Sequence, residues 1–394
     1  MATNTDIPQG YKATALGIIP QEWKTIRLKD CFSISAGGDV QKDCFSEAPS
    51  LQYKYPIYSN SLFNHGLYGF TSHPRHKANS ITITGRGALG HAEYREIDFD
   101  AIVRLLVLAP KIPLNGQYIT EYINFRKPFF YESTGVPQLT APQIANIQVL
   151  FPPLGEQRKI AEVLGVWDEA IEKQARLIEK LALRKRGLMQ RLLSAKLRLP
   201  GFSEPWKIHK LQELFTERNE TNRTDLPLLS ITGDRGVILQ TESEKRDTSN
   251  DDKSKYKRIA KGDIGYNTMR MWQGRSALSG LEGIVSPAYT IVVPNTDVDG
   301  YYMSVLFKQP RLIYDFWTHS QGLVGDTLNC KYRDFGQVHI CCPPLAEQKA
   351  ITEVLTAADR EIELAKEKLE RLRRQKRGLM QQLLSGKKRV KINI

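Results

Sequence analysis

The sequence has few cysteines and no spacing that would put them to use. Its 394 residues include five cysteines and no Cys-x-x-Cys pair. An odd, scattered set predicts neither a disulfide framework nor a zinc ribbon, so reduced thiols are expected. No apolar run approaches the roughly 20 residues of a membrane span, and the polar N-terminus lacks the apolar core of a signal peptide. These absences favour a cytoplasmic protein without a membrane partner.

Catalytic motifs are also missing. There is no P-loop, no recognisable serine or cysteine nucleophile, and no carboxylate–lysine cluster typical of nucleases. An amino-methyltransferase would need Asn or Asp before Pro-Pro-aromatic, whereas the two Pro-Pro pairs here stand in FPPL and CPPL. The histidine-rich segment HPRH, with His65 nearby, lacks a carboxylate or cysteine to complete a metal-ligand set. The sequence therefore predicts a non-catalytic chain that binds no metal.

What the sequence does contain is positive charge. The formal net charge is +13, although the hydrophobic and charged fractions are ordinary for a globular protein. Such an excess indicates a polyanionic partner, most often a nucleic acid and less often a membrane surface. A chain of this length suggests two or three domains, each with its own core.

The chain is internally duplicated. Residues 152–196 and 343–387 align without a gap at a constant offset of 191, and about half of the aligned positions are identical. A weaker echo precedes each copy, EWKTIRL and then PWKIHKL. The predicted organisation is A–B–A′–B′, in which two copies of a helical segment B each follow a longer segment A. The four predicted segments are residues 1–151, 152–198, 199–342 and 343–394.

The two B segments are predicted to be long helices. Apolar residues recur every four and three positions in each, from Ile160 to Leu192 and from Ile351 to Leu383, as in a coiled coil. In both segments the first half is acidic (net −3 over residues 156–172 and 347–363), and the second half is basic. Like-charge repulsion along a parallel pair would be unfavourable, so an antiparallel pair is expected.

The A segments show β-rich runs such as NSITIT and GIVSPAYTIVV. The expected fold class is therefore α+β: two mixed α/β domains joined by two long antiparallel helices, in a pseudo-twofold repeat. The A segments differ from each other outside their edges, which suggests two binding specificities.

The glycine-rich stretch GRGALG, residues 85–90, matches G-x-G-x-x-G after a strand. A dinucleotide site would need a helix next, yet HAEYREIDFD alternates like another strand. We instead expect a glycine turn that brings Arg86 and backbone amides to a ligand such as DNA.

Two further segments favour base contact. YNTMRMWQGR carries Asn267, Arg270, Gln273 and Arg275, and arginine can pair with guanine while Asn or Gln can pair with adenine. A strand with a buried tryptophan and solvated arginines is the alternative. The turn-rich ESTGVPQLT offers a second set, Ser133, Thr134 and Gln138, which could equally belong to a connecting loop.

The doubled PPL-x-EQ motifs, each followed by a helix that ends in KRGLMQ-x-LLS, resemble the specificity subunits of type I restriction-modification systems. GIVSPAY and STGVPQLT also resemble segments of that family's target recognition domains. The resemblance implies that each A segment reads half of a split target in double-stranded DNA. It also implies two modification subunits that methylate adenine N6 with S-adenosylmethionine, and restriction subunits that use ATP and Mg²⁺. No cofactor is expected on this chain.

The near-identical helix ends carry more apolar residues than one helix pair can bury. We expect this surplus to dock the two modification subunits, one at each repeat; the residues are Leu188, Met189, Leu192, Leu379, Met380 and Leu383. Two alternatives stay open: a coiled-coil nucleic-acid-binding protein without methyltransferase partners, and a self-contained methyltransferase or nuclease.

Overall fold

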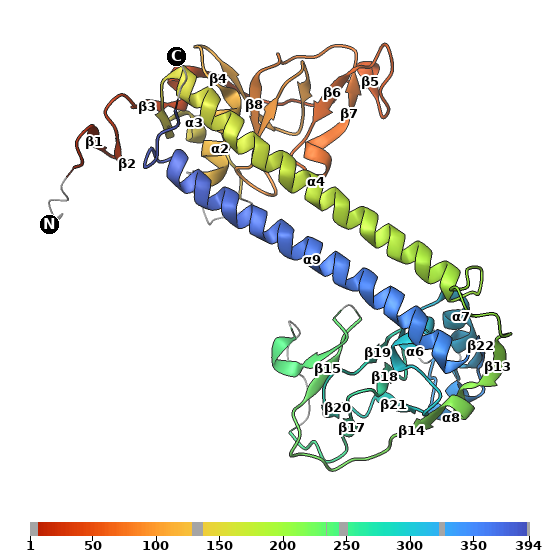
Figure 1. Ribbon diagram of the computed structural model, residues 1–394. Helices are drawn as coiled ribbons and strands as arrows, with labels where there is room; N and C mark the ends of the chain where they lie inside the picture. Colours follow the sequence, from red (N-terminus) through yellow and green to blue (C-terminus); the bar gives the residue numbers. More distant parts are fainter. Residues whose placement is uncertain (1–6, 128–136, 234, 244–250, 323–327, 392–394) are drawn as a thin grey trace. The chain divides into compact units, whose positions relative to one another are not determined.

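The computed structural model describes residues 7–127, 137–233, 235–243, 251–322 and 328–391. The chain forms two compact units (Figure 1). Unit 1 comprises residues 1–176 and 366–394, and unit 2 comprises residues 177–365. Each unit therefore combines one mixed α/β domain with parts of both long helices. Among the described helices, none is long and apolar enough to cross a membrane.

Unit 1 is built on two four-stranded sheets. The first is antiparallel throughout, in the order β4 (Phe32–Ala36), β11 (Leu106–Pro110), β8 (Ser80–Ile83) and β9 (Ala92–Arg95). The second has the order β10 (Asp100–Ala101), β6 (Tyr55–Tyr58), β7 (Leu67–Thr71) and β5 (Phe45–Ser46), with β10 parallel to β6. Two smaller pairs complete the strands: β1 (Tyr11–Thr14) with β2 (Gly17–Pro20), and β3 (Lys24–Arg27) with β12 (Gln148–Phe151).

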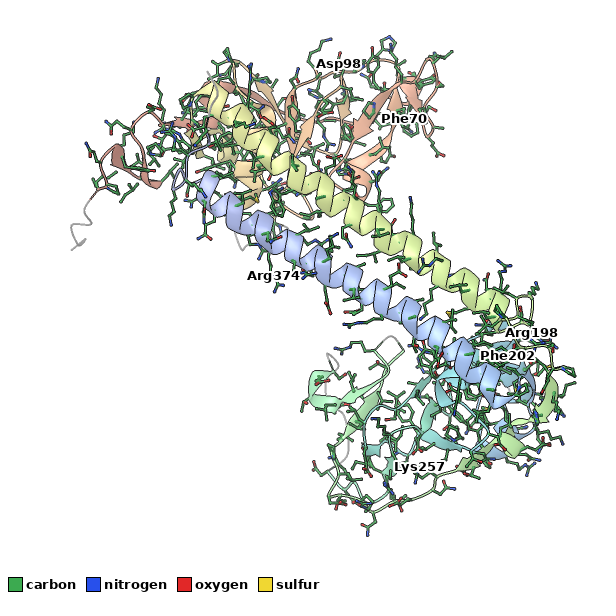
Figure 2. All side chains as sticks on the ribbon, viewed as in Figure 1. Phe70, Asp98, Arg198, Phe202, Lys257 and Arg374 are labelled. Carbon is green, nitrogen blue, oxygen red and sulfur yellow. The ribbon has the colours of Figure 1, made fainter. Side chains whose placement is uncertain are left out.

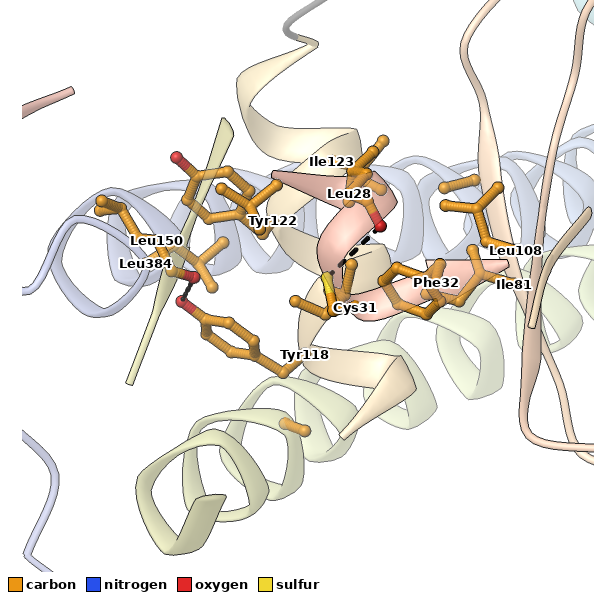
Figure 3. Packing of buried hydrophobic residues seen from close by; sticks show 14 of the residues in the cluster. Leu28, Cys31, Phe32, Ile81, Leu108, Tyr118, Tyr122, Ile123, Leu150 and Leu384 are labelled. Atoms are coloured by element: carbon orange, nitrogen blue, oxygen red, sulfur yellow. Dashed lines mark hydrogen bonds between the residues drawn. The ribbon is translucent and has the colours of Figure 1, made fainter. Parts of the chain in front are cut away.

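The short helices of unit 1 pack beside these sheets. They are α1 (Leu28–Cys31), η1 (Lys42–Cys44), η2 (Phe63–Gly66), α2 (Gly116–Arg126) and α3 (Ala141–Ala145). Figure 3 shows part of the core to which α1, α2 and α3 contribute, in which the Tyr118 hydroxyl of α2 donates to the Leu150 carbonyl at 3.1 Å. Leu384, just after the second long helix, lies in the same cluster. Burial there raises the pKa of the Cys31 thiol to about 11, and all five cysteines are free, as expected.

Unit 2 repeats the first sheet with a different sequence. Its antiparallel sheet has the order β14 (Phe215–Glu217), β21 (Tyr289–Pro294), β18 (Ile264–Asn267) and β19 (Ser276–Leu278). The other pairs are β13 (Lys207–Lys210) with β22 (His339–Cys342), β15 (Leu229–Ile231) with β16 (Val237–Leu239), and β17 (Lys257–Ile259) with β20 (Gly283–Val285). The short helices are α5 (Leu211–Leu214), η3 (Gln240–Glu242), η4 (Met271–Gln273), α6 (Gly300–Leu306), α7 (Pro310–His319) and α8 (Tyr332–Gly336).

The two sheets place their strands in the same chain order. In each unit the first strand pairs with the last, the last pairs with the second, and the second forms a hairpin with the third. A terminal strand pair, β3–β12 or β13–β22, then leads into a long helix. The prediction of two mixed α/β domains with long helices is confirmed, and the repeat extends to sheet topology although the two domain sequences diverge.

The long helices are α4 (Leu154–Leu192) and α9 (Leu345–Leu383). Each begins just after the Pro-Pro pair that follows the preceding strand. Within unit 1 the start of α4 lies beside the end of α9, and within unit 2 the start of α9 lies beside the end of α4. The helices therefore pair antiparallel in both units, as the charge pattern predicts.

Lysines in the helix seam find acidic partners across the pair. In unit 1 the Lys376 ammonium lies 2.6 Å from Asp168 and 3.0 Å from Glu121 of α2. In unit 2 the equivalent Lys185 pairs with Asp359, whose other oxygen accepts from Tyr301 at 2.6 Å. These polar interruptions of the apolar seam thus pair with one particular turn of the opposite helix, which fixes the register.

The glutamate that recurs in both PPL-x-EQ motifs is buried and hydrogen-bonded in each unit. Glu156 is 0% exposed, accepts from the Arg389 guanidinium at 2.6 and 2.9 Å, and accepts from the Trp23 indole at 2.9 Å. Glu347, 1% exposed, has the same partners in unit 2, Arg198 and Trp206. Arg198, which follows α4, is labelled in Figure 2. Each carboxylate therefore connects three parts of its unit. These are the start of one long helix, the segment that follows the other long helix, and the residue just before β3 or β13.

The helix ends do not present the apolar surplus that we expected to dock partner subunits. Leu192, Met380 and Leu383 are buried in the cores of their own units, at 0%, 9% and 2% exposure. Leu188, Met189 and Leu379 are half-buried against the same cores. The two-helix seam alone left this surplus unburied, whereas in the structure the mixed α/β domain of each unit covers much of it.

Removing the arginine partner of the buried Glu156 should destabilise unit 1. We expect Arg389→Ala to lower the free energy of unfolding by about 3 kcal/mol, because it leaves a buried carboxylate with too little compensation. Urea denaturation followed by tryptophan fluorescence measures this, since Trp23 shares the contact. Lys387→Ala, an exposed neighbour, is the matched control and should change little. Equal effects of the two substitutions would contradict the structural role of Glu156.

The lysine cluster of unit 1 should make stability depend on pH. Burial, opposed by Lys376 and reinforced by Asp168, raises the pKa of the Glu121 carboxyl to about 7. A raised folded-state pKa contributes stability that is present below the ordinary carboxyl pKa and lost as pH rises to about 7. We therefore expect Glu121→Gln to gain stability relative to wild type between pH 5 and pH 8, by about 2 kcal/mol. Tyr301→Phe in unit 2 should show no such pH difference.

Candidate nucleic-acid interface

In unit 1 the glycine-rich segment forms a hairpin loop. Residues 84–91 connect β8 to β9, and the loop closes through hydrogen bonds from Gly90 and His91 amides to Thr84, at 2.8 and 2.9 Å. Gly87 and Gly90 have φ values of 68° and 76°, which glycine adopts without strain. A strand follows and not a helix, so the rejection of a dinucleotide site is supported. Arg86 stands exposed on this loop.

One asparagine ties this loop to two others. The Asn60 side chain accepts from the Gly85 amide at 2.7 Å and donates to the Val103 carbonyl at 2.7 Å. The Leu139 amide donates to the Gly85 carbonyl at 2.9 Å, which brings the exposed Gln138 next to the same loop. Segments 59–66, 84–91 and 102–104, which we call the unit 1 loop cluster, therefore form one surface that presents Arg86 and Arg104.

Backbone strain gathers in the unit 1 loop cluster. Eight described non-glycine residues have positive φ, and four of them, Asn64, His65, Val103 and Arg104, lie here with φ between 47° and 58°. Each such residue costs about 1 kcal/mol or more. Strained backbone of this kind is typical of surfaces that are shaped for a ligand.

The carboxylate nearest to this surface is already occupied. Glu93 on β9 lies 3.0 Å from His91 and 3.3 Å from His65. Burial alone would raise its pKa, but hydrogen bonds from His91 and His65 and the charge of Arg95 bring the pKa of Glu93 below its ordinary value. The described residues contain no group of three or more His, Cys, Asp or Glu side chains placed to hold a metal. The free charge of the unit 1 loop cluster is therefore positive.

In unit 2 the predicted reading segment occupies the equivalent hairpin loop. Residues 268–275 connect β18 to β19, as residues 84–91 connect β8 to β9. Met271 is fully buried and anchors η4, whereas Arg270, Gln273 and Arg275 are exposed. The alternative, a strand with a buried tryptophan, does not match the structure. Trp272 is half-buried, and its indole donates to the Met269 carbonyl at 3.0 Å.

Three of the four predicted residues in this segment line one cavity. It measures about 570 Å³ and lies between the β15–β16 hairpin and the 268–275 loop; its lining includes Asn267, Arg270, Arg275, Arg235 and Tyr289. None of the described residues that line it is acidic, and three of them are arginines. Gln273 lines a neighbouring hollow together with Arg275 and Lys308. Such a cavity suits anionic oxygens or the acceptor edge of a guanine.

The structure thus groups most, but not all, of the residues predicted from sequence. Arg86 and Gln138 meet in unit 1, and Asn267, Arg270, Gln273 and Arg275 meet in unit 2, whereas Ser133 and Thr134 lie outside the described residues. Sequence reasoning missed Asn60, Arg104 and Arg235. For Asn60 and Arg235 the sequence offers only a turn-forming stretch, SNSLFNHG and TGDRG respectively. Their place beside the 84–91 and 268–275 loops depends on strand pairing, which the local sequence does not show.

Comparison with known proteins identifies a family for the first half of the chain. Residues 20–182 match the family described as type I restriction modification DNA specificity domain. The MjaVIII specificity subunit of Methanocaldococcus jannaschii, a type I restriction enzyme component, is 22% identical over 95% of this chain and 94% of its own. The MpnII specificity subunit of Mycoplasma pneumoniae is 28% identical, but the alignment covers 37% of this chain and 44% of that protein. Another M. pneumoniae relative is 33% identical, with 39% of its length covered.

Solved structures extend the likeness across both units. The S subunit of a type I restriction-modification system from M. genitalium superposes with a TM-score of 0.58 and 14% identity, over 92% of this chain and 96% of that one. A chain from a study of complex assembly and conformational transition of the type I R-M system superposes with a TM-score of 0.57 and 16% identity, over 93% and 99%. At these identities the likeness shows a shared fold.

Loss of the Asn60 side chain should loosen the unit 1 loop cluster. We expect Asn60→Ala to cost about 1–2 kcal/mol, because two backbone groups lose their partner. Hydrogen exchange measured by mass spectrometry should quicken in peptides covering residues 59–66, 84–91 and 102–104. Asn64→Gly is the matched control, since it relieves the left-handed strain and should leave the protection unchanged or higher. Unchanged exchange in Asn60→Ala would show that Asn60 does not hold the loops together.

Proposed function

This chain belongs to the specificity subunits of type I restriction-modification systems, and from that premise we propose that it reads a bipartite, asymmetric sequence in double-stranded DNA. Each unit reads one half of the target. The observation that carries the proposal is the equivalent hairpin loop in the two sheets, β8–β9 and β18–β19, which presents an exposed arginine in both units (Arg86 and Arg270) among otherwise different side chains.

The chemistry of the two loops supports reading of base edges. A guanidinium can donate two hydrogen bonds to O6 and N7 of guanine, and an amide can pair with adenine. Arg86 and Gln138 are available in unit 1, and Arg270, Gln273 and Arg275 in unit 2, where Asn267 is half-buried. The net charge of +13 favours the phosphate backbone in general and would draw either loop to DNA.

Catalysis in this proposal belongs to partner subunits, and this chain is the non-catalytic recognition subunit. Two modification subunits would supply S-adenosylmethionine and methylate adenine N6, after taking that base out of the stack. Restriction subunits would supply ATP- and Mg²⁺-dependent chemistry. Because Leu192, Met380 and Leu383 are buried in the cores of their own units, equivalent packing explains part of the near-identity of the two copies, and the half-buried Leu188, Met189 and Leu379 stay the proposed contacts for the modification subunits.

Single arginine substitutions should relax one half of the target at a time. We expect Arg270→Ala to lose discrimination at one or two positions of one half-site, and Arg86→Ala to do the same in the other half-site. Each bidentate contact is worth about 1–3 kcal/mol of discrimination. The measurement is a map of N6-methyladenine after co-expression with the modification subunits.

The control is Arg374→Ala, an exposed cation on α9 that is labelled in Figure 2, which should leave both half-sites as they are. Methylation without any sequence motif in wild type would contradict the proposed function. Specific binding by the purified chain alone, with no modification subunit bound, would favour the stand-alone alternative. Loss of assembly in Arg270→Ala would make that residue structural.

A further inference from the structure

The most exposed aromatic side chain described in unit 1 stands on the loop cluster. Phe63 is 85% exposed, and its neighbour Leu62 is 53% exposed. Both belong to the turn of residues 59–66 that connects β6 to β7. Burial of a phenylalanine ring is favoured in a folded chain, so this ring has no role in the stability of unit 1.

The turn beneath the ring is held firmly. The Ser59 amide donates to the Gly66 carbonyl at 2.8 Å, and the Phe63 amide donates to the Ser61 hydroxyl at 3.1 Å. Gly66 has φ of 79°, and a Cβ there would lie 2.8 Å from the Ser59 carbonyl oxygen. Asn64 and His65 adopt left-handed conformations, and the Asn60 side chain is hydrogen-bonded to the other two loops. The turn that carries the Phe63 ring is therefore restrained.

Polar groups surround this apolar tip. Through Asn60, the turn is joined to Gly85, next to the exposed Arg86, and to Val103, next to the exposed Arg104. The nearby carboxylate of Glu93 is paired with His65 and His91. An exposed phenylalanine ring with arginines on the neighbouring loops is complementary to DNA, which has anionic phosphates on the outside and stacked aromatic bases inside.

We propose that Phe63 is a wedge that enters the base stack of the half-site read by unit 1. The inference rests on the proposed DNA reading and adds to it how that half-site is deformed. Apolar side chains inserted between base steps unstack and kink the duplex, and they favour flexible pyrimidine–purine steps. Unit 1 thus selects its half-site partly by deformability, at a step beside the bases that Arg86 contacts.

The second unit supplies an internal contrast. Its β15–β16 hairpin holds the same place in chain order as β6–β7, and its turn also touches the reading loop, since a Cβ at Gly233 would collide with the Arg275 guanidinium. That turn presents Arg235, which is exposed and donates to the Glu242 carbonyl at 2.9 Å. Among the described residues of that turn none is aromatic. The deformation caused by an inserted aromatic ring from this turn is therefore expected at the unit 1 half-site only.

The test uses the assembled complex of this chain with its modification subunits, on the target sequence found by methylation mapping. 2-Aminopurine is placed at each step of both half-sites in turn, away from the adenine that is methylated. Wild type should brighten at one step of the unit 1 half-site and nowhere in the unit 2 half-site. Phe63→Ala should abolish that signal and weaken specific binding about 10- to 100-fold, whereas Phe63→Trp should retain both.

Ile97→Ala is the matched control, because Ile97 is 53% exposed in the same unit but follows β9 at the end away from the 84–91 loop; it should bind and brighten like wild type. Specific binding by Phe63→Ala with an unchanged signal overturns the wedge and leaves the proposed function intact. Absence of specific binding by wild type overturns the proposed function itself. Loss of modification-subunit assembly by Phe63→Ala without DNA would make the ring a protein contact and also overturn the wedge.

Discussion

The buried glutamate of the PPL-x-EQ motif is the interaction on which each unit depends. Glu156 and Glu347 have almost no exposed surface, and each is compensated by an arginine and an indole from distant segments. A carboxylate in such a place is tolerated only with charged and hydrogen-bonded partners. The glutamate therefore requires that helix, tail and entering strand assemble together, and it does so once in each unit.

The next residue of the motif extends this control to the domain. Gln157 donates to the Pro152 carbonyl at 2.8 Å and accepts from the Asn115 amide at 2.9 Å. Asn115 in turn caps α2 by accepting from the Tyr118 amide. Gln348 binds Pro343 and the α6 cap, Asp299, in the same way. A repeated dipeptide thus positions a helix of the recognition domain on the long helix, whatever the loops of that domain carry.

A constant frame with variable loops is what a reader of two different sequences requires. The sheet order is the same in both units, while the β8–β9 and β18–β19 loops share an exposed arginine (Arg86 and Arg270) and differ in their other exposed side chains. Since these loops contribute little to the core beyond anchors such as Met271, their exposed residues can change without loss of the fold. Stability and specificity are carried by separate residues.

Local pattern was enough to find the helices, their antiparallel pairing and the loops that expose Arg86 and Arg270, because period, charge and turn chemistry depend on neighbours in sequence. It could not find Asn60 or Phe63, since strand pairing brings residue 60 to residues 85 and 103. It also misjudged Leu192 and Leu383, which look like surplus on a helix but are buried by a domain core. The sequence by itself determined the duplicated frame, and the tertiary structure decided which surfaces stay free, because burial is a property of the whole assembled unit.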